Sequence, residues 1–229
     1  METPPPPRDT YHHGNLRAAL IQATLSLIEE KGPDLVTVAE AAKRAGVSSG
    51  APFRHFTSKV DLMTAVAEVL QQELLGRMDR AYGQNLDHPW ERLWWLGMAH
   101  MDWGLEQPTH FRTYSNRKLY DFESSPVLLE GDEKLSWLVE STFQSVLPQV
   151  SNRNERARRL NIHARALLTG LVTLHCNGHF PRLGVEGEQP IVTMQKSWLG
   201  FLHAVRFNLE DRPEETQFYD PILTKRPLD

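Results

Sequence analysis

The chain has 229 residues, a formal net charge of −4 and 40% hydrophobic residues, so it is long enough to bury a core without disulfides. Its single cysteine excludes an intrachain disulfide and favours a reducing cytoplasm. The N-terminus lacks the apolar stretch of a signal peptide, and no apolar run is long enough for a membrane span. We therefore expect a cytoplasmic protein without membrane contact.

Residues 1–10 contain a run of prolines and are expected to form a disordered arm. Beyond this arm, apolar residues recur at helical spacing, and the alternation typical of strands is almost absent. The expected helices cover approximately residues 16–31, 37–45, 49–56, 58–78, 89–106, 110–119, 126–147, 154–176 and 189–209. The polar tail, residues 211–229, follows the last of them. The sequence predicts an all-α protein.

Two short helices joined by residues 45–48 have the layout of a helix-turn-helix. Thr37 and Glu40 have the spacing of a capping box, which predicts where the first of these helices begins. Gly46 fits a turn whose backbone conformation excludes bulky residues. Ser58 and the acid three residues later form a second capping-box pattern, at the start of a long amphipathic helix.

The second helix of this motif, residues 49–56, contains Pro52. If Ser49 caps the helix, the proline falls at the third position, where the missing N–H has no helical partner anyway. If Ser48 is the cap, Pro52 removes one hydrogen bond. In both cases Gly50 and Ala51 are small enough to let the backbone approach base edges in a DNA groove.

Charge is unevenly distributed along the chain. Residues 1–60 carry seven Lys/Arg and six Asp/Glu, and the window from Lys43 to Lys59 contains no acid. Local rather than total charge steers a protein to phosphates, so this window predicts DNA contact. We expect contact foremost from Arg54 and Lys59 and less from Lys43 and Arg44. For Arg17, a phosphate contact and a merely exposed position both stay open.

The stretch from Tyr11 to about Ala67 resembles the DNA-binding domain of the TetR family of transcriptional regulators. The residues that carry the resemblance are Gly32, Thr37-Val38-Ala39-Glu40-Ala41-Ala42, Ala45-Gly46-Val47-Ser48, Phe53-x-His55-Phe56, Lys59 and Asp61-Leu62. Residues 11–17 resemble the lead-in of one subgroup, whose C-terminal domain has a Trp-His-Gly signature. Here the nearest stretch is Leu168-Thr169-Gly170, which departs from that signature.

The resemblance implies an all-helical homodimer, with a helix-turn-helix domain at residues 11–57 and a ligand-binding and dimerisation domain at residues 58–210. By matching position, it implies phosphate contacts for Thr37, Phe53, His55 and Lys59. It implies that Ser49, Gly50, Ala51 and Arg54 face base edges, and Ser48 completes the expected DNA-binding set. The family commonly has tyrosine where Phe53 stands, so the phenyl ring lacks the hydroxyl that would reach a phosphate.

A stripe of large residues in the segment 90–103 has two interpretations. Trp94, Met98 and Met101 share one helical face, which is ordinarily packed core. So many large side chains can also line an apolar ligand cavity, with His100 as a polar edge. Under that second interpretation the ligand-binding residues are Trp94, Met98, Met101, Phe111 and Tyr114.

His175, Cys176 and His179 form a small cluster with metal-ligand spacing, but a dedicated third ligand is lacking nearby. The cysteine is more typical of a small buried hydrophobe, so any role of the cluster stays open, and we expect no metal or cofactor. The chain also lacks a phosphate-binding glycine loop, a nucleophile elbow and an HExxH pattern, so an enzyme is not expected.

Together these features predict a dimeric regulator, most simply a repressor released from a palindromic operator by a small, largely apolar molecule. The alternative is a DNA-binding helical protein that acts as an activator or architectural factor without a ligand. The two C-terminal helices are the expected dimer interface because both are rich in apolar residues. These residues are Leu160, Leu167, Leu171, Leu174, Trp198, Leu202 and Val205.

Overall fold

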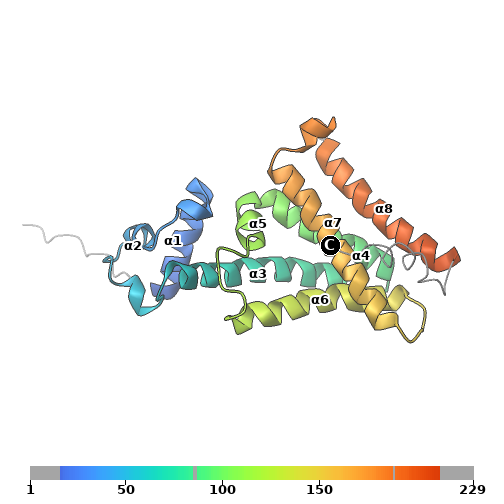
Figure 1. Cartoon of the computed structure of the whole chain (residues 1–229), viewed down its shortest axis with the longest axis horizontal. Helices are drawn as coiled ribbons and strands as arrows, with labels where there is room; N and C mark the ends of the chain where they lie inside the picture. Colours follow the sequence, from blue (N-terminus) through green and yellow to red (C-terminus); the bar gives the residue numbers. More distant parts are fainter. Residues whose placement is uncertain (1–15, 85–86, 188, 212–229) are drawn as a thin grey trace, which may run out of the picture. The chain divides into compact units, whose positions relative to one another are not determined.

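The computed structural model describes residues 16–84, 87–187 and 189–211, and the expected arm and most of the tail lie outside these ranges (Figure 1). Every regular element within them is helical, which confirms the all-α prediction. The elements are α1 (Leu16–Lys31), η2 (Pro33–Leu35), α2 (Val38–Arg44), η3 (Pro52–Arg54), α3 (Lys59–Gln84), α4 (Pro89–Glu106), α5 (Pro108–Ser115), α6 (Pro126–Val146), α7 (Arg153–Cys176), η4 (Phe180–Leu183) and α8 (Gln189–Asp211).

Contacts divide the chain into two compact units. The first unit holds the described residues up to Gln72 together with Thr109–Glu130, and the second holds Glu73–Pro108 and the described residues from Gly131 onward. The helix α3 is continuous through the boundary, so it contributes to both units. The functional division expected after residue 57 stays a prediction.

In the first unit, α1 packs on α2 through the apolar face that the sequence pattern predicts. Leu20, Ala23 and Leu27 are all buried at helical spacing on α1. The helix ends where Gly32 takes a φ of 84°, and the Gly32 N–H still donates to the carbonyl of Ile28 at 2.8 Å. Glycine adopts this left-handed conformation without steric cost, so it serves as the stop signal.

In the second unit, α4 packs against both α7 and α8. Trp103 and Trp198 are fully buried there, together with Met101. The Trp198 indole N–H donates to the backbone carbonyl of Trp94 at 3.2 Å, which ties α8 to α4. The indole ring occupies the place that a side chain on Gly97 would take, so the two helices approach closely at that glycine.

Two helix boundaries differ most from those expected. The helix α3 continues to Gln84 rather than ending near residue 78, because no glycine or proline interrupts it between Met78 and Gly83. The helix α5 ends at Ser115 rather than near residue 119, because the Asn116 side-chain oxygen accepts from the Lys118 N–H at 3.3 Å and forms a local turn. Within the described ranges, no helix is both long and apolar enough to span a membrane.

Candidate nucleic-acid interface

The start of α2 is held by the predicted capping box. The Thr37 hydroxyl accepts from the Glu40 N–H at 3.2 Å, and the Glu40 carboxylate accepts from the Thr37 N–H at 3.1 Å. The same carboxylate accepts from the Lys31 ammonium of α1. That ammonium first, and the Thr37 hydroxyl second, lower the pKa of Glu40 to about 2. The end of α2 that the resemblance places at a phosphate is therefore fixed to α1 by an ion pair.

The turn after α2 depends on Gly46, as the sequence predicts. Its φ of 72° lies in the left-handed region, which an L-residue with a side chain adopts only with strain. The following Val47 N–H donates to the Ala42 carbonyl at 3.0 Å, which closes the end of the helix. The turn then leads the chain directly into the segment that the sequence assigns to base recognition.

The prediction of an α-helix over residues 49–56 is wrong, since the segment contains only the 3₁₀ turn η3 (Pro52–Arg54). Neither serine caps it. Pro52 has no N–H to donate to the Ser48 carbonyl, which accepts from the Ala51 N–H at 3.0 Å instead. The His55 N–H likewise donates to the Pro52 carbonyl, three residues back, at 2.9 Å. Proline and small residues thus leave a tight turn where the sequence pattern predicts a longer helix.

This recognition segment, residues 48–56, has one inward and one outward side. Pro52 and Phe56 are buried and anchor it to the unit. Phe53 is 58% exposed, which is unusual for a phenyl ring. Ser48, Ser49, Gly50, Arg54 and His55 are also exposed, whereas Ala51 is half-buried. Most of the predicted DNA-binding residues of this segment are therefore accessible from outside.

Lys59 begins α3 beside the recognition segment. Its ammonium donates to the backbone carbonyl of Asp34 at 3.0 Å, and since an ammonium has three donors, others stay available for a phosphate. The helix start is fixed by Ser58, whose hydroxyl accepts from the Asp61 N–H at 3.1 Å. The Asp61 carboxylate accepts from the Thr57 N–H at 2.9 Å rather than from that of Ser58, so the predicted box closes one residue earlier.

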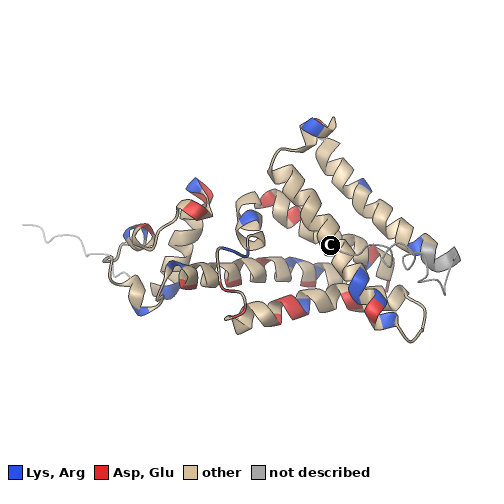
Figure 2. Ribbon diagram, in the orientation of Figure 1, with Lys and Arg blue, Asp and Glu red and all other residues tan. Residues whose placement is uncertain are grey.

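Two other arginines of this unit are engaged within the protein. Arg44 pairs with Glu30 through both guanidinium nitrogens, with Nη2 to Oε2 at 2.7 Å, and this pairing lowers the pKa of Glu30. Arg17 pairs with Glu68 at 3.3 Å. Figure 2 shows both signs of charge on α1 and on α2. By contrast, Arg54 has no ion pair among the described residues, which leaves its guanidinium available for a base or a phosphate.

The predicted ligand-binding residues fall into both units. In the second unit Met98 and Met101 are buried, and Trp94 is half-buried. In the first unit Phe111 and Tyr114 are buried, and the Tyr114 hydroxyl accepts from the Gln71 amide at 3.1 Å. These positions suit packed core as well as they suit a cavity lining, so the ligand assignment stays a prediction.

The histidine and cysteine residues near the end of α7 make separate contacts in the structure. His175 packs its ring near that of Phe180, with centroids 6.3 Å apart. Cys176 is half-buried, with its sulfur 3.8 Å from the Gly104 carbonyl oxygen. Within the described part of the chain, no group of three or more His, Cys, Asp or Glu side chains is arranged to hold a metal ion.

A capped short helix, a glycine turn and an exposed recognition segment follow the layout of a DNA-binding helix-turn-helix, with the second helix shortened to the turn η3. The family can also be stated. Residues 20–66 match the model of the bacterial regulatory proteins of the tetR family. The chain therefore carries the DNA-binding domain of TetR-family transcriptional regulators, as the sequence resemblance predicts.

Curated relatives match mainly this domain. The nucleoid occlusion factor SlmA of Vibrio cholerae is 32% identical over 74 residues, 32% of this chain and 38% of that protein. SlmA of Haemophilus influenzae is 29% identical over 156 residues, 68% of this chain and 69% of that protein. The HTH-type transcriptional repressor KstR2 of Rhodococcus jostii is 31% identical over 85 residues, 37% of this chain and 42% of that protein. In two of these three relatives, the match spans less than half of the relative's length.

Solved structures share the fold over most of the chain. A protein of unknown function from Rhodococcus sp. RHA1 has a TM-score of 0.70 at 22% identity, covering 86% of this chain and 98% of that one. A possible TetR family regulator from Streptomyces coelicolor A3(2) has a TM-score of 0.62 at 20% identity, covering 83% and 98%. FadR from Bacillus subtilis, solved with stearoyl-CoA, has a TM-score of 0.59 at 15% identity, covering 81% and 96%. At these identities the likeness shows the fold alone.

Proposed function

We propose that this protein is a dimeric, ligand-responsive transcriptional regulator that represses its target by occupying a palindromic operator. The observation that carries the proposal is the exposed recognition segment, with Phe53, Arg54 and His55 facing outward beside the capped α2 and the start of α3. Two such segments related by a twofold axis fit successive major grooves of one DNA face.

The different contacts proposed for Lys59, which binds a phosphate, and Arg54, which binds a base, give a direct test. Lys59→Ala should weaken binding to every DNA sequence about equally, because a phosphate contact carries no sequence information. It should also lower the slope of log binding constant against log salt concentration by about one for each phosphate that is no longer neutralised. Arg54→Ala should cost about 1–3 kcal/mol and act mainly at one base position if the guanidinium binds a guanine. Phe53→Tyr should tighten binding modestly without changing sequence preference, because it adds a phosphate-reaching hydroxyl.

Fluorescence anisotropy at several salt concentrations, on the operator and on scrambled DNA, measures all three effects. Arg158→Ala is the matched control, because Arg158 is an exposed arginine of the second unit. A change in base preference for Lys59→Ala, with none for Arg54→Ala, would reverse the two assignments.

The proposed dimer uses exposed stripes of α7 and α8. Leu171 and Leu202, which the sequence pattern places in the interface helices, are buried inside the second unit and belong to its own core. The outward apolar residues are Ile162 at 59%, Leu199 at 41% and Phe207 at 64% exposure. Leu199 and Phe207 lie on the same side of α8, and both side chains are exposed among the described residues of their own chain. Two antiparallel helix pairs can bury such stripes against each other.

Leu199→Glu combined with Ile162→Glu should therefore give a folded monomer, because a charge in a twofold interface meets its own copy. Sedimentation measures the mass, and footprinting should show two protected half-sites about 34–36 Å apart for the parent and none for the monomer at equal concentration. Leu183→Glu, also at an exposed apolar position but on η4, is the control and should leave the dimer intact. A double variant that still sediments as a dimer would place the interface elsewhere.

Two of the compared proteins support the proposal that this protein is a repressor and that it binds an organic ligand. KstR2 is named as a repressor, and FadR was solved with the acyl thioester stearoyl-CoA, so a repressor released by an organic molecule is the simplest expectation. A ligand needs to favour the non-binding conformation by only a few kcal/mol to empty the operator. Mass spectrometry of molecules that co-purify with the protein is the most informative first measurement.

A second candidate function is a DNA-binding factor that works without a ligand. The similarity to two SlmA proteins, which are named as nucleoid occlusion factors, supports this second function. The two functions differ in where the protein binds. A repressor should occupy a few operators near promoters, whereas a nucleoid factor should occupy many sites spread over the chromosome. Sequencing of DNA crosslinked to the protein in cells separates these outcomes.

A further inference from the structure

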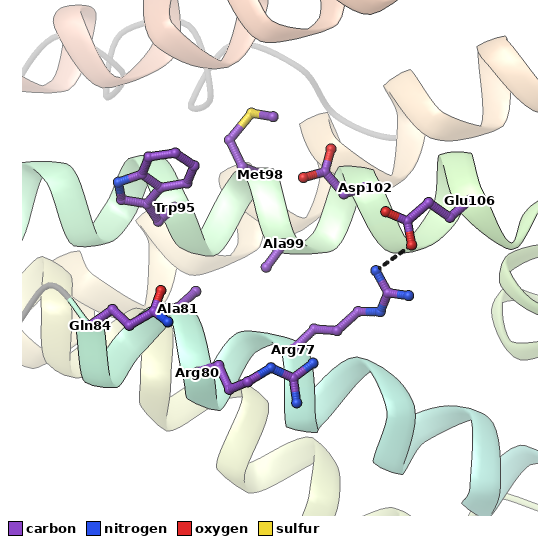
Figure 3. A pocket seen from close by; sticks show the side chains of 9 residues that line it. All are labelled: Arg77, Arg80, Ala81, Gln84, Trp95, Met98, Ala99, Asp102 and Glu106. Carbon is purple, nitrogen blue, oxygen red and sulfur yellow. Dashed lines mark ion pairs between the residues drawn. The ribbon is translucent and has the colours of Figure 1, made fainter.

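A cleft of about 230 Å³ opens between α3 and α4, wholly within the second unit. Figure 3 shows that one helix contributes Arg77 and Arg80 and the facing helix contributes Trp95 and Asp102. Its volume lies below the range of about 300–1,000 Å³ typical of sites for drug-sized ligands. The cleft therefore suits a small molecule, and it is distinct from the apolar cavity that the sequence predicts, with which it shares only Met98.

One end of the cleft is ionic. Arg77 is already paired there, with its Nη1 2.8 Å from Oε2 of Glu106. Arg80 has no ion pair among the described residues, and its Nη1 lies 3.7 Å from the position that a Cβ on Gly76 would take. The absence of a side chain at Gly76 leaves room for this guanidinium along α3. A guanidinium without an ion pair at the edge of a cleft is a fork-shaped donor that matches a carboxylate.

The other end of the cleft holds the flat ring of Trp95 together with the Gln84 amide. Trp95 is 48% exposed, so much of its ring is open to a ligand. Ala81 and Ala99 come from the two facing helices, and their small side chains leave space beside the indole. Met98 also lines the cleft, although its side chain is largely buried. A planar apolar group stacked on Trp95 would bury this surface.

We propose that the cleft binds a small planar monocarboxylate, with its ring on Trp95 and its carboxylate on the Arg80 guanidinium. This assignment rests on the proposed function, because it names the chemical class of the effector. The neighbouring acid fixes the orientation. Burial first, and the nearby Glu106 carboxylate second, raise the pKa of Asp102, which means that negative charge is already disfavoured at that position. An anionic group is therefore directed away from Asp102 and toward Arg80.

Titration calorimetry with phenylacetate on the full-length protein tests the assignment. The parent protein should bind phenylacetate, and Arg80→Gln should weaken binding about 10-fold or more, the effect of losing a charge-assisted hydrogen bond. Arg80→Lys should recover part of the affinity, because it restores the charge but not the fork. Trp95→Leu should also weaken binding, whereas Arg158→Gln, which removes a charge outside the cleft, should leave it unchanged.

Two ligand controls separate the contributions. Phenylacetamide keeps the ring and lacks the charge, and hexanoate keeps the charge and lacks the ring, so both should bind more weakly than phenylacetate. Absence of phenylacetate binding by the parent, or equal binding by Arg80→Gln, would overturn the site. Anisotropy on operator DNA with and without phenylacetate is a separate measurement. Binding in the cleft without an effect on DNA would support the site and count against ligand control of DNA binding.

Discussion

Replacing Gly97 by alanine should destabilise the second unit by about 3 kcal/mol, at the upper end of the cost of overpacking a core. A Cβ at this position would lie 2.2 Å from Nε1 and 2.3 Å from Cε2 of Trp198. The indole is only 1% exposed and its N–H is bonded to the Trp94 carbonyl, so the ring cannot move aside without losing that bond and its packing. Urea denaturation followed by circular dichroism measures the loss.

Two further variants isolate the cause. Gly83→Ala is the matched control, because nothing lies within 4 Å of a Cβ there, and alanine should stabilise α3 slightly through its helix propensity. Trp198→Leu removes the indole at its own cost, and in its presence the additional cost of Gly97→Ala should largely disappear. Additive losses in the double variant would show that the Gly97 effect does not arise from this contact.

The parts of the fold that sequence predicts best are those set by local chemistry. The capping box of Thr37 and Glu40 involves residues three apart, so both partners are visible in the sequence. The left-handed turn at Gly46 likewise depends on one residue and its immediate neighbours. The same applies to the apolar face of α1, whose period identifies Leu16, Leu20, Ala23 and Leu27, of which all but the half-buried Leu16 are buried.

The parts that sequence misses depend on residues far apart in the chain or on two competing local preferences. Pro52 is compatible with a helix whether Ser48 or Ser49 caps it. The segment forms a 3₁₀ turn because its backbone carbonyls accept mainly from N–H groups three residues ahead rather than four. Arg44 belongs to an acid-free window, yet its partner Glu30 lies 14 residues earlier on α1. The cleft brings Arg80 and Trp95 together from two helices, and helix periodicity cannot say which faces of two helices meet.

His100 should make the second unit sensitive to acid. Burial first, and the positive charge of Arg165 second, lower the pKa of this imidazole from 6.5 to about 4. The folded protein therefore keeps His100 neutral at pH values where the unfolded chain already binds a proton. Stability that is present above pH 6.5 is lost progressively as the pH falls toward 4, and this one group accounts for at most about 3 kcal/mol of the loss.

His100→Gln replaces the imidazole by an amide that does not titrate, so the free energy of unfolding should fall less steeply between pH 6.5 and 4 than in the parent. The slope is the diagnostic quantity, because altered packing shifts stability at every pH whereas removal of a titrating group changes only its pH dependence. Urea denaturation at closely spaced pH values, at one protein concentration, measures it. His163→Gln, at an exposed position on α7, serves as the control for removing an imidazole. An unchanged slope in His100→Gln would mean that the buried imidazole does not govern the acid response, and that the carboxylates paired in the folded state do.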